Sequence, residues 1–388
     1  MQKILEIFWK FLSLGCLSFG GPAAHLGYFH KAFVQQLKWI DEAGYARLVA
    51  LCQVLPGPGS SQVGFAIGLR KGGLAGGIAA FIGFTTPSFI LMYLLASNQP
   101  SETQAAWFSG LIHGLKLLAV VVVADATLSM WGSFCKDKLT RIIAVAVAMV
   151  LLVVPGLWIQ IGVLIIAATL GLLLSKNEPS SPAVPAKNHK IAWGYLSVFI
   201  ALFIALPTLA FSSDWMKLLG DFYQSGSLVF GGGHVVLPLL QQSLGETVAT
   251  DRFLMGYAAA QAMPGPMFTL GSFLGAELMS DQPFLGALLA TIAIFLPGFL
   301  LVLALQGSWE TLANKPKVSG AITGINAAVV GLLLSALYSP VFVSAVIAPL
   351  DMALVIAGFF ALRGLKLPII TVVFGFAVAG ILMHAFTG

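Results

Sequence analysis

Two Pro-Gly-Pro motifs interrupt long apolar segments of this chain and place new helix ends inside them. The first is Pro56-Gly57-Pro58, followed by Gly59-Ser60-Ser61-Gln62. Proline lacks a backbone donor and blocks the preceding turn, so one helix stops here and another begins after Pro58. The first amides of the new helix have no intrahelical acceptor and present about half a positive charge. Because hydroxyls and an amide stand beside them, Gly59, Ser60, Ser61 and Gln62 are predicted to bind an anion.

The second motif, Pro264-Gly265-Pro266, opens toward Met267, Phe268 and Thr269, which offer one hydroxyl. We therefore expect two unequal half-sites, with Thr269 as the donor of the poorer one. A simpler interpretation is that each motif only kinks a membrane helix, which such helices tolerate. The recurrence of the motif at equivalent places favours a transport site.

Glycine pairs and histidines form a second group of candidates. Gly20-Gly21 and Gly231-Gly232 end apolar segments, and the left-handed backbone that glycine allows can turn successive N–H groups into an anion-binding concavity. A plain helix C-cap explains these glycines equally well. His25 and His234 follow within a few residues, out of equivalent register. Each is either a local hydrogen-bonding residue, the commoner role, or a ligand or proton carrier.

One lysine lies deep in an apolar segment. Lys116 is about three turns from either end of the segment 104–131, and Asn326 takes its place in the second half of the chain. Ionisable groups inside lipid are costly and are functional candidates. Lys116 and Asn326 are therefore candidate substrate contacts, although an ion pair with another helix explains Lys116 equally well. Asp125 is expected to pair with Lys116 or to relay protons.

The composition shows what kind of protein must position these residues. The 388 residues are 58% hydrophobic and 9% charged, with a mean hydropathy of +0.94, so the chain is predicted to be an all-α polytopic membrane protein. The net charge of +5 comes from Lys and Arg scattered in short loops, which argues against a nucleic-acid partner. The three cysteines have no metal or disulfide spacing, and we expect no metal and no cofactor.

We predict thirteen membrane crossings, counting each Pro-Gly-Pro segment as one crossing made of two half-helices. They are 3–20, 41–70, 73–97, 104–131, 139–155, 157–175, 191–211, 214–232, 250–279, 283–306, 318–338, 345–362 and 367–386. The positive-inside rule then puts the N-terminus in the cytoplasm and the C-terminus outside, with Lys31 and Lys38 as exceptions. A rival count folds the two Pro-Gly-Pro segments as re-entrant hairpins and gives eleven crossings.

The chain is predicted to contain two homologous halves, 1–175 and 212–388, joined by a cytoplasmic linker at 176–190 and an extra helix at 191–211. The motifs recur at an offset of about 208 to 211 residues. These motifs are Phe19-Gly20-Gly21, Gln53-x-x-Pro56-Gly57-Pro58, Pro87-x-Phe89 and the pair Gly110 and Gly114. With the odd extra helix, the repeats are inverted, an architecture typical of secondary transporters whose site lies where broken helices meet.

The motifs also carry a family resemblance. Phe19-Gly20-Gly21-Pro22-x-x-His25-x-Gly27-Tyr28-Phe29 and Leu55-Pro56-Gly57-Pro58-x-x-x-Gln62 resemble the signature of the chromate ion transporter family, long-chain two-domain type. The second half is similar to that family's C-terminal half. The resemblance implies an exporter of chromate, or of a sulfate-like oxyanion, in the inner membrane lipid bilayer. A homodimer is compatible with the sequence.

The leading functional hypothesis is therefore a secondary anion transporter that confers chromate resistance. The sequence has no Gly-x-x-x-x-Gly-Lys-Ser/Thr loop for ATP, and outward movement of a dianion down a potential of about 100 mV releases about 4.6 kcal/mol. Alternatives are a transporter of sulfate or another anion and, less favoured, an intramembrane enzyme. The chain contains no paired catalytic motif, so we expect no enzymatic activity.

Overall fold

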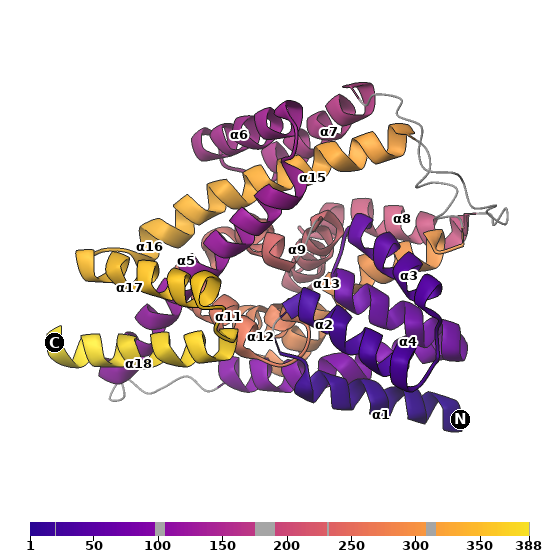
Figure 1. The fold of residues 1–388 in the computed structure, drawn as a ribbon, viewed down its shortest axis with the longest axis horizontal. Helices are drawn as coiled ribbons and strands as arrows, with labels where there is room; N and C mark the ends of the chain where they lie inside the picture. The colour runs from indigo at the N-terminus through magenta and orange to yellow at the C-terminus, as the bar shows by residue number, and fades with distance from the viewer. Residues whose placement is uncertain (20, 98–104, 175–190, 231–232, 308–315, 388) are drawn as a thin grey trace.

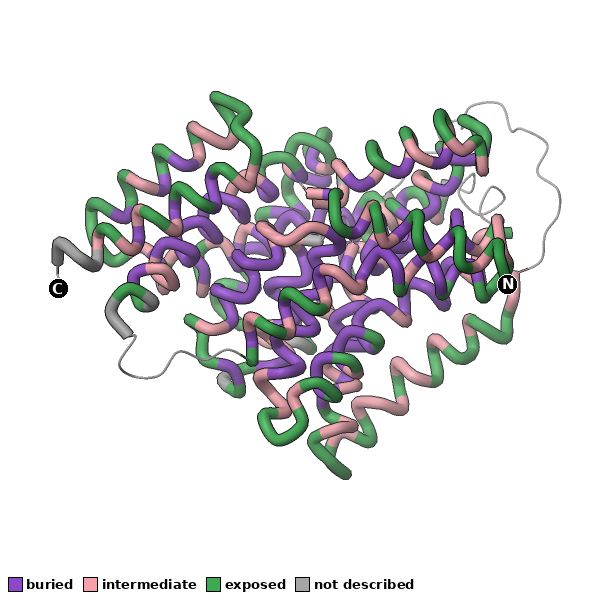
Figure 2. The backbone as a smooth tube through the Cα atoms, turned by 90° about the horizontal axis from the view of Figure 1, so that it is seen from below, coloured by how far each residue is buried: buried purple, intermediate pink, exposed green. Residues whose placement is uncertain are grey.

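The computed structural model describes residues 1–388 except 20, 98–104, 175–190, 231–232, 308–315 and 388. Every regular element in the described part is a helix, which confirms the all-α prediction. Among the described residues, four helices are long and apolar enough to cross a membrane, namely Gly59–Ser97, Ser109–Phe134, Pro283–Leu305 and Lys317–Ala345. Buried residues gather in the middle of the molecule (Figure 2). The outer faces carry exposed apolar side chains such as Met149, Ile165 and Phe374, as expected for a multi-pass membrane protein.

The described residues of the first half form seven α-helices before the predicted linker, which itself lies outside the described residues. They are α1 (Gln2–Leu17), α2 (Gly21–Phe29, continued by a π-helix at His30–Gln36), α3 (Glu42–Val54), α4 (Gly59–Ser97), α5 (Ala105–Phe134), α6 (Lys138–Val153) and α7 (Leu157–Leu174). Gly72 and Gly73 have non-helical backbone angles and divide α4 into a short arm, 59–71, and a long arm, 74–97.

The second half repeats this order after the extra helix α8 (Trp193–Leu209), which packs on α9 and α13. Its helices are α9 (Asp214–Leu228), α10 (Val236–Leu244), α11 (Thr250–Ala262), α12 (Leu270–Leu278), α13 (Pro283–Leu305), α15 (Pro316–Ala336), α16 (Val343–Ala345), α17 (Pro349–Phe359) and α18 (Ile369–Thr387). The α12 and α13 helices correspond to the two arms of α4. The helices α15, α17 and α18 correspond to α5, α6 and α7.

Helices α1 and α2 form a hairpin that reaches only halfway along the long arm of α4. The start of α1 lies beside the start of that arm, because a Cβ on Gly72 would lie 3.0 Å from Ile4 Cδ1. The end of α1 reaches only as far as Phe84, next to Gly15. The chain then returns, since Phe33 stacks on Phe11 with ring centroids 4.7 Å apart.

The two Pro-Gly-Pro segments also turn back. In the first, Gly44 at the start of α3 lies near Arg70 at the end of the short arm of α4, with a Cβ on Gly44 3.1 Å from the guanidinium Nη1. In the second, Arg252 at the start of α11 pairs with Glu277 at the end of α12. Both segments are therefore hairpins with a Pro-Gly-Pro turn at the tip.

The predicted crossings at 3–20, 41–70, 214–232 and 250–279 are therefore wrong. Each of these segments ends halfway and is followed by a returning helix, so that its backbone ends meet protein and not lipid. Because the first half contains two such hairpins, the sides assigned to later segments are unchanged. The hairpins also return Lys31 and Lys38 to the side of the N-terminus, where Lys71 lies 4.9 Å from the Trp39 ring. The two exceptions to the charge pattern thereby disappear.

The second pair of hairpins opens on the opposite side. Arg252 Nη2, at the start of α11, donates to the carbonyl of Ala96 at the end of α4 (3.4 Å). Hairpins of the first half begin where the long arm of α4 starts, and those of the second half begin where it ends. The repeats are inverted, and the two termini lie at opposite ends of the molecule (Figure 1).

One long helix of each half packs against helices of the other half, and glycines lie at these contacts. Helix α5 packs on α17 and α18, and α15 packs on α6 and α7. A Cβ on Gly114 of α5 would overlap the carbonyl oxygen of Phe376, and a Cβ on Gly324 of α15 would overlap that of Ala167. The glycines repeated in the sequence thus allow backbones from opposite halves to touch. These helices form a scaffold around the four hairpins.

The hairpin arrangement predicts the membrane side of the loop after α2. In a variant without native cysteines, Gln36→Cys and Lys136→Cys should react with an impermeant maleimide from one side of sealed vesicles, because both loops face the side of the N-terminus. Asp281→Cys should react from the other side. Reaction of Gln36→Cys from the same side as Asp281→Cys would restore the single-crossing interpretation.

Candidate functional site

The tips of the hairpins meet at the centre and are joined by two hydrogen bonds between the halves. Gly57 N–H, in the first Pro-Gly-Pro turn, donates to the carbonyl of Val229 at the end of α9 (2.7 Å). Gly265 N–H, in the second turn, donates to the carbonyl of Ser18 at the end of α1 (2.9 Å). Each bond satisfies two backbone groups that helix breaks leave without partners. The breaks in one half are thus stabilised by those in the other.

Glycine is required at both turns. Gly57 has φ +122° and Gly265 has φ +97°, values that residues with a side chain rarely adopt. Space is also short, because a Cβ on Gly57 would lie 3.0 Å from Gly298 Cα and one on Gly265 would lie 2.8 Å from Ser88 Oγ. Ser88 and Gly298 each follow a proline of the repeated Pro-x-Phe motif. Each turn therefore rests on the proline-containing helix of the other half.

The N-terminus of the short arm of α4, at Gly59, lies at this centre. Gln62 N–H already donates to the Pro58 carbonyl (2.9 Å), so the amides with no acceptor inside the helix are those of Gly59, Ser60 and Ser61. Ser60 Oγ lies 3.2 Å from His25 Nδ1. His25 does not line the cavity in front of this helix end. Ser61 Oγ is buried and has no hydrogen-bond partner. A buried polar atom without a partner is costly, which points to a ligand that it would bind.

Gln62 was predicted to bind an anion, but its side-chain amide is engaged within the protein. Its Nε2 donates to the Pro56 carbonyl (3.0 Å) and to the Gly298 carbonyl of α13 (3.1 Å). With its side-chain donors and its backbone N–H engaged, Gln62 fixes the turn against the other half and offers no free donor to an anion. Its Oε1 has no partner.

A cavity of about 460 Å³ lies in front of this helix end. Polar lining comes from Gln53, Ser60, Ser61, Ser133 and Asn326, and no residue of the lining is charged. The lining extends to Ser133 and Phe134 at the end of α5, so the cavity reaches toward the side on which the N-terminus lies. The main source of positive potential within the cavity is therefore the N-terminus of α4, an arrangement suited to an anion.

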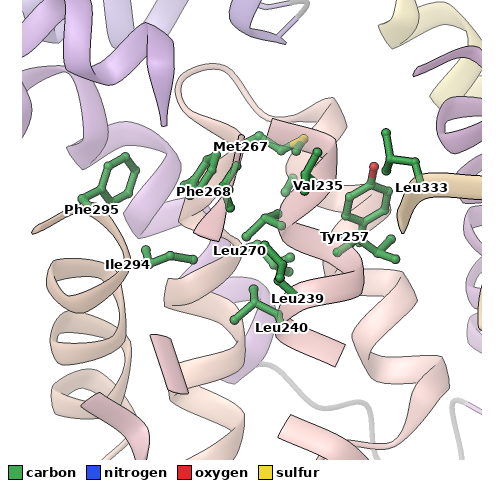
Figure 3. Packing of buried hydrophobic residues seen from close by; sticks show 14 of the residues in the cluster. Val235, Leu239, Leu240, Tyr257, Met267, Phe268, Leu270, Ile294, Phe295 and Leu333 are labelled. Carbon is green, nitrogen blue, oxygen red and sulfur yellow. The ribbon is translucent and has the colours of Figure 1, made fainter. Parts of the chain in front are cut away.

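The second Pro-Gly-Pro turn contributes an apolar wall. A 3₁₀ turn at Met267–Thr269 precedes α12, and Met267 and Phe268 line the cavity. Thr269 Oγ1 donates back to the Pro266 carbonyl (2.8 Å), so this predicted donor is already engaged. Behind the turn lie packed apolar side chains, including Val235, Tyr257, Leu270 and Leu333 (Figure 3). The two half-sites are unequal, and the first supplies the polar groups.

Two other predicted site residues lie away from the cavity wall. His234 Nδ1 lies 3.0 Å from Tyr257 Oη and 3.3 Å from Gln261 Nε2, so it is a local hydrogen-bonding residue. Lys116 Nζ donates to Asp251 Oδ1 (2.7 Å), in a second cavity of about 410 Å³ that also holds His113 and Asp351. Asp125 pairs with Arg363 and not with Lys116.

The glycine pairs are partly placed. Gly21 has φ +74° at the start of α2, whereas Gly20, Gly231 and Gly232 lie outside the described residues. Gln53 lines the cavity and is exposed to it, yet it was not predicted as a site residue. Its recurrence as Gln261, three residues before each Pro-Gly-Pro motif, was the signal that could have identified it.

Comparison with known proteins agrees with the two-half organisation. The sequence matches the family model described as chromate transporter over residues 5–172 and again over 216–381. It is 28% identical to the probable chromate transport protein of Synechococcus elongatus, over 84% of this chain and 81% of that protein. It is 26% identical to the chromate transport protein of Pseudomonas aeruginosa (84% and 79%) and 25% identical to that of Cupriavidus metallidurans (85% and 81%). No solved structure matches.

The geometry of the first turn predicts a large effect of a single methyl group. Gly57→Ala should lower the free energy of unfolding by at least about 1 kcal/mol, because a side chain disfavours positive φ and the methyl meets the Gly298 backbone. Gly27→Ala is the matched control, since nothing lies within 4 Å of a Cβ there. Thermal unfolding in detergent measures both. Equal melting temperatures of the two variants would contradict the tight turn.

Proposed function

Because this chain belongs to the chromate transporter family, we propose that it is a secondary transporter that carries chromate out of the cell across the cytoplasmic membrane. The observation that supports this most directly is the buried N-terminus of α4. It presents the unsatisfied Ser61 hydroxyl beside a cavity lined by no charged residue. Relatives named chromate transport proteins align with most of the chain. We infer that the oxyanion oxygens accept hydrogen bonds from the amides of Gly59, Ser60 and Ser61.

An uncharged anion site suits a substrate that must leave again. A buried lysine or arginine would bind a dianion tightly and would itself be costly in the membrane. Backbone amides and hydroxyls replace the hydration of the anion without a formal cation. Binding can then be strong enough to select a tetrahedral oxyanion and weak enough to release it.

The direction that we propose follows from charge and cavity together. The loops on the side of the N-terminus hold Arg70, Lys71, Lys136, Lys138, Arg141, Arg363 and Lys366, which favours that side as the cytoplasmic one. The cavity reaches toward the same side, so a cytoplasmic anion would enter it. An inside-negative potential of about 100 mV would then drive a dianion outward with about 4.6 kcal/mol. Sulfate has the same charge and shape and is the main alternative substrate.

Carboxylates at the helix end should block transport. Ser61→Asp or Ser60→Asp would place a fixed negative charge where the oxyanion binds, so uptake of labelled chromate into inverted vesicles should fall to the background. Ser61→Ala should raise the apparent KM about tenfold, because a hydrogen bond to a charged group is worth about 1.5 to 3 kcal/mol.

The control is Ser227→Ala, at a buried serine whose hydroxyl donates within its own helix to Tyr223 (2.7 Å). Uptake is normalised to the amount of monodisperse protein. Near-normal uptake by both aspartate variants would remove the helix N-terminus from the proposed site, and stronger inhibition by sulfate than by chromate would reassign the substrate.

A further inference from the structure

The two inverted halves are not in equivalent states. Val49, Cys52 and Gln53 of α3 line the central cavity. At an offset of 208 residues, their counterparts in α11 are Tyr257, Ala260 and Gln261. Gln53 is exposed and Val49 half-buried, whereas Gln261 is half-buried and Tyr257 is fully buried. Cys52 and Ala260 are both buried, so the two halves differ in exposure at the first and third of these positions.

The buried surface of α11 is an interface between a hairpin and the scaffold. Helix α11 packs along α5 and also contacts α18. The label of α11 lies beside α5 in Figure 1. In the part of the chain that the structure describes, no comparable packing joins its counterpart α3 to α15 or α7. The central cavity occupies that place, and Asn326 of α15 faces it. We call the contact between α11 and α5 the shut gate, and the corresponding gap between α3 and α15 the open gate.

An ion pair bridges the shut gate. Lys116 of α5 donates to Asp251 at the start of α11 (2.7 Å), with 11% of the lysine side chain and 61% of the aspartate side chain exposed. The positions that correspond to them in the other half are Asn326 and Ala43, which cannot form an ion pair. Only one of the two repeat-related gates can thus be held by this attraction.

We propose that the Lys116–Asp251 ion pair latches the gate on the C-terminal side and favours the state that is open toward the N-terminus. In inverted-repeat transporters the opposite state is reached when one unit rocks against the other. Here that movement would separate α11 from α5, expose Gln261 as Gln53 is exposed now, and bring α3 toward α15. Lys116 is in this account a positioning residue of the gate. The inference rests on the proposed transport function, but its readout is thiol reactivity and not transport.

The chain supplies a matched pair of reporters. In a variant whose native cysteines are replaced, Gln53→Cys reports the open gate, because Gln53 is exposed to the cavity. Gln261→Cys, at the corresponding half-buried position, reports the shut one. An impermeant maleimide applied to either side of sealed vesicles should modify Gln53→Cys from the side of the N-terminus. Gln261→Cys should react slowly, and from the other side.

Breaking the latch should raise the population of the opposite state. Lys116→Gln and Asp251→Asn should each increase the reaction rate of Gln261→Cys about fivefold, the change expected for a partly exposed ion pair. The exchanged pair, Lys116→Asp with Asp251→Lys, should return the rate to within about twofold of the original. Asp125→Asn is the control, because it breaks another pair that α5 makes with the second half, Asp125–Arg363 (2.7 Å), away from this gate.

Unchanged labelling in both single variants, or failure of the exchanged pair to restore the rate in monodisperse protein, would overturn the latch. Equal acceleration by Asp125→Asn would do the same, because it would indicate a general loosening of the scaffold. Failure of the anion site would leave all of these labelling results unaltered.

Discussion

A break in a helix at the middle of a membrane leaves backbone groups that lipid cannot satisfy, and this constraint shapes the whole structure. Four hairpins end at the centre of the molecule. Backbone groups at their tips form hydrogen bonds between the two halves. Gly57 donates to Val229, and Gly265 donates to Ser18. Neither half contains both partners of either bond. The backbone groups at the tips of one half are therefore satisfied by the other half, and α5 and α15 pack on the helices of the opposite half around them.

The same constraint leaves one polar helix end for function. After the second turn, a 3₁₀ turn precedes α12, and the Thr269 hydroxyl donates to the Pro266 carbonyl. At the first turn, the amides of Gly59 to Ser61 have no acceptor inside the helix, and the hydroxyl of Ser61 has no partner. The two repeats thus form one polar wall, where we propose that the anion binds, opposed by an apolar wall. The difference lies in Gly-Ser-Ser after the first motif against Met-Phe-Thr after the second.

Local sequence predicted the elements whose causes are local. Proline and glycine fixed the positions of the breaks, and composition fixed the helical membrane class. The path of the chain after each break depends on contacts between distant segments, so a crossing and a returning hairpin have the same sequence pattern. Lys31 and Lys38, on the wrong side in the thirteen-crossing count, were the sign of the error.

The partners of the polar side chains were not predictable for the same reason. Gln62 donates to Gly298, 236 residues away, and Lys116 pairs with Asp251, 135 residues away. Neither partner lies near in sequence or at a repeat-related position. Local motifs therefore identified Ser60 and Ser61 as the start of a helix, but could not tell that Gln62 faces the opposite half or that Gln53 faces the cavity.

The central claim is that a tetrahedral oxyanion binds at the N-terminus of α4. Anomalous scattering from chromium in crystals of the protein grown with chromate tests it most directly. The account predicts a peak in the central cavity, with its oxygens within hydrogen-bonding distance of the amides of Gly59, Ser60 and Ser61. A peak beside Lys116 and Asp251, with the central cavity empty at saturating chromate, would contradict it.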